Sequence, residues 1–289
     1  MPTKNREHVS GSYLPGKQES DMKIGILYIC TGNYAVFWKG FYKSAEKYLF
    51  ADKDKYRKHY YVFTDQQELY AKDSPDVTVI YQKDLGWPGN TLYRFHMFLT
   101  QKEKLQQEDY LFFFNANLRF QKNVGEEFVS CGKDLIMVKS PVAYGVESVT
   151  EFLEKNPKSK AYIEEQKADI YVAGGLNGGR TTAYLDMVEQ LKENIDTDDQ
   201  ESIIAVHHDE THLNQYFYTN RDRVAVFGVE HLYPEFWILP FTPKILLIDK
   251  GRYGGHKRIR SNSRIKLPTF QYIRSWFVWK ILLMVRKRR

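Results

Sequence analysis

Two polar segments hold the side chains best suited to chemistry. His208-Asp209-Glu210 opens a predicted helix and supplies two adjacent carboxylates. A carboxylate can act as a nucleophile or stabilise a cationic transition state, although acidic groups also lie at helix N-termini for structural reasons alone. Asn115 and Asn117 follow the apolar run 111–114, at a strand end where open α/β sheets bind ligands. Their amides are weak ligands for a hard cation, and a turn capped by two amides is an equally good interpretation.

Charge is divided unevenly along the chain. Of the 289 residues, 42 are Lys or Arg and 36 are Asp or Glu, which gives a net charge of +6. Residues 250–289 hold 13 of the basic residues and no acid, so this segment carries +13 and the preceding body about −7. The binding partner of the basic segment could be a nucleic acid, an anionic membrane or an anionic substrate. The only cysteines, Cys30 and Cys131, exclude a disulfide framework and favour a reducing compartment.

Alternating strands and helices must position these side chains. Short apolar runs predict strands at 23–29, 60–64, 77–81, 110–114, 135–138, 171–173 and 244–248. Helical spacing predicts helices from the turn at 31–33 to about residue 50 and at about 90–107, 180–194 and 209–218. The glycines of 174–179 are typical of a tight turn. Because no repeat or low-complexity linker interrupts 22–249, one mixed α/β domain is expected.

The two ends of the chain differ from this domain. Residues 1–21 are polar and lack the pattern of a signal peptide, so we expect a disordered leader and no export. In the tail, 261–289, an apolar stretch from Trp276 to Val285 contains only Lys280 as a charge and ends in four basic residues. It is too short to cross a bilayer core of about 30 Å, but an interfacial helix on anionic lipid could use it. A helix docked on the acidic body is the alternative.

The tail also decides between kinds of partner. Its aromatic residues cluster with Ile, Leu and Val, which suits lipid better than base stacking, so a nucleic-acid partner is not expected. We predict that residues 264–289 hold the protein peripherally on an anionic membrane surface, at the cytoplasmic inner face of the cell membrane.

Six segments carry a resemblance to a known family. They are IGILYICTGNY (24–34), HYYVFTDQ (59–66), GWPGNTLYRFHMF (86–98), DYLFFFNAN (109–117), YVAGGLNGG (171–179) and HHDETHLNQYF (207–217). In order and approximate spacing, over about 24–258, they resemble glycosyltransferase family 6, which contains the histo-blood-group A and B transferases and the α-1,3-galactosyltransferases. The resemblance implies a single-domain GT-A-type fold over 22–260 with a mixed, mainly parallel sheet. It also implies retaining transfer of a hexose from a UDP-sugar to the 3-hydroxyl of a β-galactoside, plain or fucosylated.

The resemblance also implies roles for individual residues. Glu210 would be catalytic, beneath the anomeric carbon. Donor contacts would come from Ile29, Thr31, Tyr34, Arg94, Asn115, Asn117, Ala173, Gly175, Asp209, Lys250, Arg258 and Arg260. Acceptor contacts would come from His208, Glu235 and Trp237. Double displacement through Glu210 and front-face attack beside it both remain open.

One departure from the family pattern changes the expected chemistry. Asn115 and Asn117 stand where the family has metal-binding Asp residues, so we expect no divalent metal and activity that survives EDTA. Basic side chains must then stabilise the leaving diphosphate, with Lys250 the first choice and Arg258 or Arg260 the second. Gly254-Gly255 would give this segment hinge freedom.

The small residues Ala173 and Gly175 stand where the family tunes its donor. They leave room for a 2-acetamido group, which favours UDP-N-acetylgalactosamine (UDP-GalNAc), with UDP-galactose (UDP-Gal) as the alternative. The acceptor loop departs from the family, and a lipid-linked or surface glycan such as lipopolysaccharide is the expected acceptor. The alternative of another class is a catalytically inactive protein that binds glycans or anionic surfaces.

Overall fold

A seven-stranded mixed sheet forms the centre of the molecule. The computed structural model describes residues 21–164, 168–261, 265 and 268–286, so nearly all of the predicted leader lies outside the described residues. In spatial order the strands are β3 (Val77–Tyr81), β2 (Tyr56–Thr64), β1 (Met22–Ile29), β4 (Tyr110–Phe114), β7 (Val172–Arg180), β6 (Leu135–Lys139) and β8 (Val224–Phe227). All neighbours pair in parallel except β7, which is antiparallel to both β4 and β6. The predicted mixed, mainly parallel α/β fold is confirmed.

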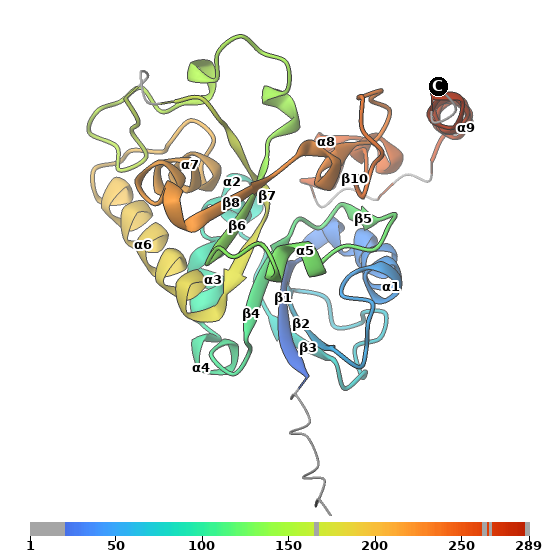
Figure 1. Ribbon diagram of the computed structural model, residues 1–289, viewed down its shortest axis with the longest axis horizontal. Helices are drawn as coiled ribbons and strands as arrows, with labels where there is room; N and C mark the ends of the chain where they lie inside the picture. The colour runs from blue at the N-terminus through green and yellow to red at the C-terminus, as the bar shows by residue number, and fades with distance from the viewer. Residues whose placement is uncertain (1–20, 165–167, 262–264, 266–267, 287–289) are drawn as a thin grey trace, which may run out of the picture.

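Helices cover both faces of this sheet (Figure 1). They are α1 (Trp38–Tyr48), α2 (Gly86–Leu92), α3 (Arg94–Leu99), α4 (Lys102–Leu105), α5 (Glu126–Val129), α6 (Thr181–Gln200), α7 (Asp209–Thr219), α8 (His256–Ile259) and α9 (Phe270–Arg286). Short 3₁₀ turns are η1 (Gly32–Phe37), η2 (Pro141–Ala143), η3 (Thr150–Phe152), η5 (Arg221–Arg223), η6 (Val229–His231) and η7 (Lys250–Tyr253). A small second sheet joins β5 (Leu118–Phe120), β10 (Ile245–Leu247) and β9 (Tyr233–Pro234) in that order.

Strand β4 shows how the sequence builds two cores at once. Alternate side chains of a strand point to opposite faces, so Phe112 and Phe114 enter the core under α1, whereas Leu111 and Phe113 enter the core under α3, α6 and α7. All four are buried. An uninterrupted apolar run is therefore required, because neither face of this strand meets water.

Strand β7 differs from the sequence prediction. It continues through the glycine-rich segment, where a tight turn was expected. Its residues 176–180 pair with β4, and its residues 177–179 and Val172 pair with β6 on either side of a register shift. The glycines serve close packing: a Cβ at Gly178 would overlap the ring of Phe112 and the carbonyl of Leu111. Glycine in a strand often marks such close approach, and composition alone does not separate it from a turn.

Three other elements depart from the prediction. The helix expected at about 90–107 is divided into α2, α3 and α4, because the backbone leaves helical geometry at Tyr93 and Gln101. Each of the three helices buries apolar residues of its own. The sequence therefore shows one continuous helical pattern, although the backbone is interrupted twice. Strand β8 and the pairing of β5, β10 and β9 were not predicted, since strands this short have little periodicity.

The predicted C-terminal helix is present as α9. One side packs on the body, with Trp279 only 3% exposed, as the docked alternative required. Within the described part of the chain, no helix combines the length and hydropathy needed to cross a bilayer. The predicted function of the tail depends on its other side, which is taken up below.

Candidate active site

A pocket opens where β1 and β4 end at their carboxyl termini. It is lined by Ile29, Thr31, Tyr34, Asp84, Gly86, Trp87, Asn90, Thr91, Arg94, Phe113, Asn115, Ala116, Lys250, Ile259 and Arg260. The lining joins the turn after β1, the α2–α3 segment, the end of β4 and the basic segment around η7 and α8. Seven residues predicted to bind the donor meet here: Ile29, Thr31, Tyr34, Arg94, Asn115, Lys250 and Arg260.

Arg94 is the buried cation of this pocket. It is 4% exposed, its Nη1 donates to the carbonyl of Gly174 at 2.6 Å, and its guanidinium lies 4.5 Å from the ring centre of Phe113. Its Nη2 forms an ion pair with the carboxylate of Asp209, which is 2% exposed. Because both charges are out of water, each depends on the other.

The two predicted carboxylates lie at the start of α7. Oε2 of Glu210 accepts the backbone N–H of Gly174 at 2.6 Å, so β7 fixes the direction of this side chain. Burial raises the pKa of Asp209 to about 7, although the neighbouring Arg94 opposes that rise. A Cβ at Gly174 would lie 3.2 Å from atoms of Arg94, Asp209 and Glu210, so these three side chains converge on one glycine. The carboxylate pair thus lies directly behind the pocket that Arg94 lines.

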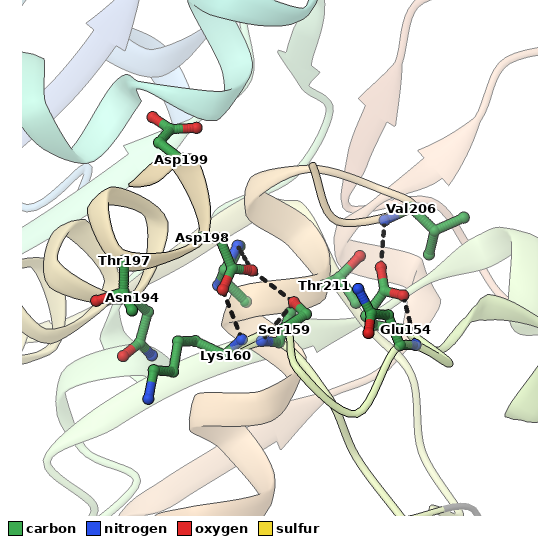
Figure 2. A network of polar contacts seen from close by, with 12 residues as sticks. Glu154, Ser159, Lys160, Asn194, Thr197, Asp198, Asp199, Val206 and Thr211 are labelled. Carbon is green, nitrogen blue, oxygen red and sulfur yellow. Dashed lines mark hydrogen bonds and ion pairs between the residues drawn. The ribbon is translucent and has the colours of Figure 1, made fainter. Parts of the chain in front are cut away.

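A network of polar contacts holds the loop that leads into α7 (Figure 2). Glu154 accepts the N–H of Val206 at 2.9 Å, and the N–H of His207 donates to Thr211 at 3.0 Å. At the end of α6, Asp198 accepts from the Ser159 hydroxyl and from the N–H of Lys160 at 2.7 Å. These contacts tie the 154–160 loop to the end of α6 and to the loop before α7, the helix that begins with Asp209 and Glu210.

The two asparagines after β4 have different places. Asn115 lines the pocket, whereas Asn117 is buried and its Nδ2 donates to the carbonyl of Ile248 at 2.7 Å. A divalent cation needs several oxygen ligands, preferably carboxylates. Asn115 offers the pocket one neutral amide and the Asn117 amide is turned toward the backbone, so these two side chains alone are a poor ligand set for such an ion. Among the described residues, no group of three or more His, Cys, Asp or Glu is arranged to hold a metal ion.

The basic segment supplies cations to the pocket unevenly. Nζ of Lys250 lies 5.2 Å from the ring centre of Tyr34, and the guanidinium of Arg260 lies 4.5 Å from that of Trp87. Arg258 is not among the lining residues; its side chain lies over Gly254 instead. Gly254 and Gly255 both have positive φ, 98° and 88°, which favours glycine at each position.

The predicted acceptor residues are dispersed. The ring of His208 packs edge-on against Trp87 at 5.1 Å, and burial, with smaller effects of His207 and Arg260, lowers its pKa. Glu235 is 4% exposed, and its Oε2 accepts from the N–H of Asp249 at 3.0 Å and from the Tyr272 hydroxyl at 2.7 Å.

The remaining predicted residues, Trp237, Ala173 and Gly175, do not line the pocket. Trp237 is exposed, and its carbonyl accepts from Nε1 of Trp279 at 2.8 Å. Ala173 is buried in the core, and Gly175 lies behind Asn115, whose N–H donates to its carbonyl at 2.8 Å.

Sequence reasoning missed part of the lining. Asp84 accepts the N–H of Gly86 at 2.9 Å and Nδ2 of Asn90 at 2.6 Å, and thereby shapes the α2 side of the pocket beside Trp87. The available signal was the segment GWPGNT itself, because glycine, proline and asparagine together are typical of a shaped loop. The hydrogen bond from the backbone N–H of Gly174 to Glu210 could not be predicted, because no side chain in the sequence marks it.

A pocket at the carboxyl ends of parallel strands lies where open α/β sheets bind their ligands, and this pocket has aromatic and cationic side chains in its lining. The model of glycosyltransferase family 6 matches residues 13–245, and the chain belongs to this family. Among its relatives is the O-antigen biosynthesis glycosyltransferase WbnI of Escherichia coli, 34% identical over 82% of this chain and 100% of its own length.

Two animal relatives extend the comparison. Histo-blood group ABO system transferase 1 of Rattus norvegicus is 29% identical over 67% of this chain and 56% of its own length. Globoside alpha-1,3-N-acetylgalactosaminyltransferase 1 of Homo sapiens is 25% identical over 80% of this chain and 66% of its own length. The chain thus covers less than two thirds of each of these two relatives. The family match together with the names of the bacterial and animal relatives supports a hexosyltransferase.

Proposed function

We propose that the protein transfers N-acetylgalactosamine from UDP-GalNAc to the 3-hydroxyl of a β-galactoside, with retention and without a divalent metal. The convergence of Arg94, Asp209 and Glu210 on Gly174, beside a cation-lined pocket, carries this proposal. The human relative, named for α-1,3-N-acetylgalactosaminyl transfer, supports the reaction type.

The pocket has parts suited to both halves of a UDP-sugar. Ile29, Thr31 and Tyr34 would contact the uridine, whereas Lys250 and Arg260, which line the same pocket, would stabilise the leaving diphosphate. The bond from the anomeric carbon to the phosphate oxygen breaks, and its electron pair leaves with UDP. The acceptor oxygen passes its proton to the departing UDP phosphate oxygen and forms the new bond to the anomeric carbon on the face that UDP leaves. Glu210 acts either as the nucleophile of a double displacement or as the anion that stabilises an oxocarbenium ion.

Charge from the basic segment replaces a metal in this proposal. In buffer containing EDTA, Lys250→Ala is expected to lower kcat/KM for the donor roughly 10- to 100-fold, because it removes a cation from the phosphate side of the pocket. Arg258→Ala is the matched control and should cost much less, since Arg258 does not line the pocket. Initial rates of UDP release measure both. Equal losses in the two variants, or activity that EDTA abolishes and Mn²⁺ restores, would contradict the assignment.

Residue 175 allows the donor to be tested. When UDP-GalNAc and UDP-Gal compete at equal concentration, transfer of N-acetylgalactosamine should predominate. A Cβ added at Gly175 would lie 3.5 Å from Nδ2 of Asn115, so it fits the protein but occupies space next to the pocket. Gly175→Ala is therefore expected to shift the product ratio roughly tenfold toward galactose, as one methyl group can do in a specificity pocket.

The donor experiment has a simple control. Gly40→Ala adds a methyl group where no atom lies within 4 Å, and it should leave the product ratio unchanged. Mass spectrometry of the products gives the ratio directly. A wild-type preference for galactose would overturn the donor assignment while leaving the reaction class intact.

The acceptor is proposed as a galactoside, plain or fucosylated, on a lipid-linked glycan of the lipopolysaccharide type. The relative named for O-antigen biosynthesis supports this choice. An array of galactosides tests it, since transfer should require a terminal β-galactose. Complete absence of both transfer and donor hydrolysis would instead identify an inactive glycan-binding protein.

A further inference from the structure

Helix α9 has two unlike faces. Tyr272, Trp276, Trp279 and Leu283 form a stripe at helical spacing that faces the body, and Trp279 packs against Phe236 at 5.8 Å. Away from the body the helix exposes eight large apolar side chains, namely Phe270, Ile273, Phe277, Val278, Ile281, Leu282, Met284 and Val285. Its exposed polar residues, Gln271, Arg274 and Ser275, lie in the first half of the helix. A soluble monomer rarely leaves so many large apolar side chains together in water.

Two side-chain hydrogen bonds fix which face points outward. The Tyr272 hydroxyl donates to Glu235, and Nε1 of Trp279 donates to the carbonyl of Trp237. Both bonds lie on the body side of α9, so the exposed apolar face is turned outward by the fold. In Figure 1, α9 is seen end-on at the edge of the molecule, far from α6 and α7.

A strongly basic groove runs beside this face, between α9 and α1. It is lined by Gly40, Lys43, Ser44, Lys47, Tyr48, Arg119, Phe120, Gln121, Glu235, Leu246, Ile248, Arg252, Trp276 and Lys280. Five of these residues are cationic, namely Lys43, Lys47, Arg119, Arg252 and Lys280. The single carboxylate, Glu235, is already hydrogen-bonded to Tyr272 and to the N–H of Asp249. The groove therefore presents an excess of positive charge.

We propose that the α1–α9 groove and the exposed face of α9 together bind an anionic phospholipid membrane. Lipid phosphates would occupy the groove, and the apolar face of α9 would enter the boundary between headgroups and acyl chains. Lys280 joins the two parts, because it lines the groove and lies one turn from exposed Phe277 and Met284. The membrane-binding surface thus includes Lys43, Lys47 and Arg119 of the catalytic body, in addition to the tail. This inference is independent of the donor and acceptor proposed above.

The side chains of this surface suit a membrane better than a nucleic acid. An oligonucleotide needs cations and stacking rings, but gains nothing from Ile281, Leu282 and Val285. A bilayer with negative headgroups matches the cations and the aliphatic side chains in their observed arrangement. Attachment would also orient the sugar site, since Glu235 joins α9 to Asp249, the residue before Lys250 of the pocket.

Sedimentation with vesicles tests the proposal on the full chain at about 0.15 M salt. The protein should bind phosphatidylcholine vesicles containing phosphatidylglycerol and should not bind pure phosphatidylcholine. The double variant Lys43→Gln/Lys47→Gln should weaken binding at least tenfold, because each basic residue near an anionic surface contributes severalfold to partition. Lys158→Gln/Lys160→Gln removes the same charge beside α6 and should bind as the wild type does.

A second variant separates the apolar contribution from charge. Phe277→Ser/Ile281→Ser changes two exposed side chains of α9 and should also reduce vesicle binding, while sugar transfer to a soluble galactoside stays unchanged. Equal binding to both kinds of vesicle, no effect of the Lys43/Lys47 variant, or preferential binding to a single-stranded oligonucleotide would overturn the proposal. Burial of the α9 face in a stable dimer, seen as a doubled mass in solution, would overturn it as well.

Discussion

Replacing Glu210 by Gln is expected to lower the turnover number roughly 10²- to 10⁴-fold while leaving the fold intact. The Gln side chain retains an oxygen that can accept the N–H of Gly174, which Oε2 of Glu210 accepts at 2.6 Å. The negative charge, however, is lost at the position where positive charge develops on the sugar. Initial rates with saturating donor and acceptor measure the effect.

Two controls make the Glu210 result specific. Glu201→Gln changes an exposed carboxylate after α6 and should leave turnover unchanged. Thermal unfolding of Glu210→Gln should match the wild type, because its backbone contact is retained. Near wild-type turnover in Glu210→Gln would rule out both the nucleophile and the ion-pair role.

Replacing Arg94 by Met has the largest expected effect on stability. The change leaves Asp209 buried without its cation, and breaking a buried pair costs about 3–5 kcal/mol. The midpoint of thermal unfolding should fall by roughly 10 °C, and transfer should be lost because Arg94 also lines the donor pocket. The double variant Arg94→Met/Asp209→Asn should be more stable than Arg94→Met alone, since it removes the unpaired charge.

The pH dependence of the stability of Arg94→Met independently tests the ion pair between Arg94 and Asp209. In the wild type the pKa of Asp209 is already raised to about 7, and without Arg94 it should rise further. A carboxyl whose pKa is raised by folding binds more protons in the folded state than in the unfolded state. Stability is then gained as pH falls toward the unfolded pKa. Arg94→Met should therefore recover stability as the pH is lowered from 8 to 6, relative to the wild type. A loss that does not vary with pH would contradict this account.

The elements that hold the site were predictable where apolar patterns are strong. Strands β1 and β4 are apolar runs, and α7 begins with acidic residues, so their positions follow from burial and helix-end electrostatics. The family motifs then named Arg94 and the residues after β1, which meet in one pocket. The sequence was sufficient to predict these elements and residues, because each is marked by the type of its side chains and by their position along the chain.

The features that escaped prediction depend on backbone and tertiary contact. The N–H and carbonyl of Gly174 hold Glu210 and Arg94, and no residue type reports a backbone hydrogen bond. Glycines in β7 look like a turn until Phe112 is packed against them. Helix α9 carries large apolar residues on both its buried and its exposed side, so its sequence alone does not tell that the stripe around Trp279 contacts the body.

The most direct test of the central claim is the structure of the product made by the purified chain in EDTA. UDP-GalNAc and a β-galactoside are incubated together, and nuclear magnetic resonance determines the configuration and position of the new linkage. We expect N-acetylgalactosamine in α configuration on the 3-hydroxyl of galactose. A β linkage, a different position, or product that forms only when a divalent metal is restored would contradict it.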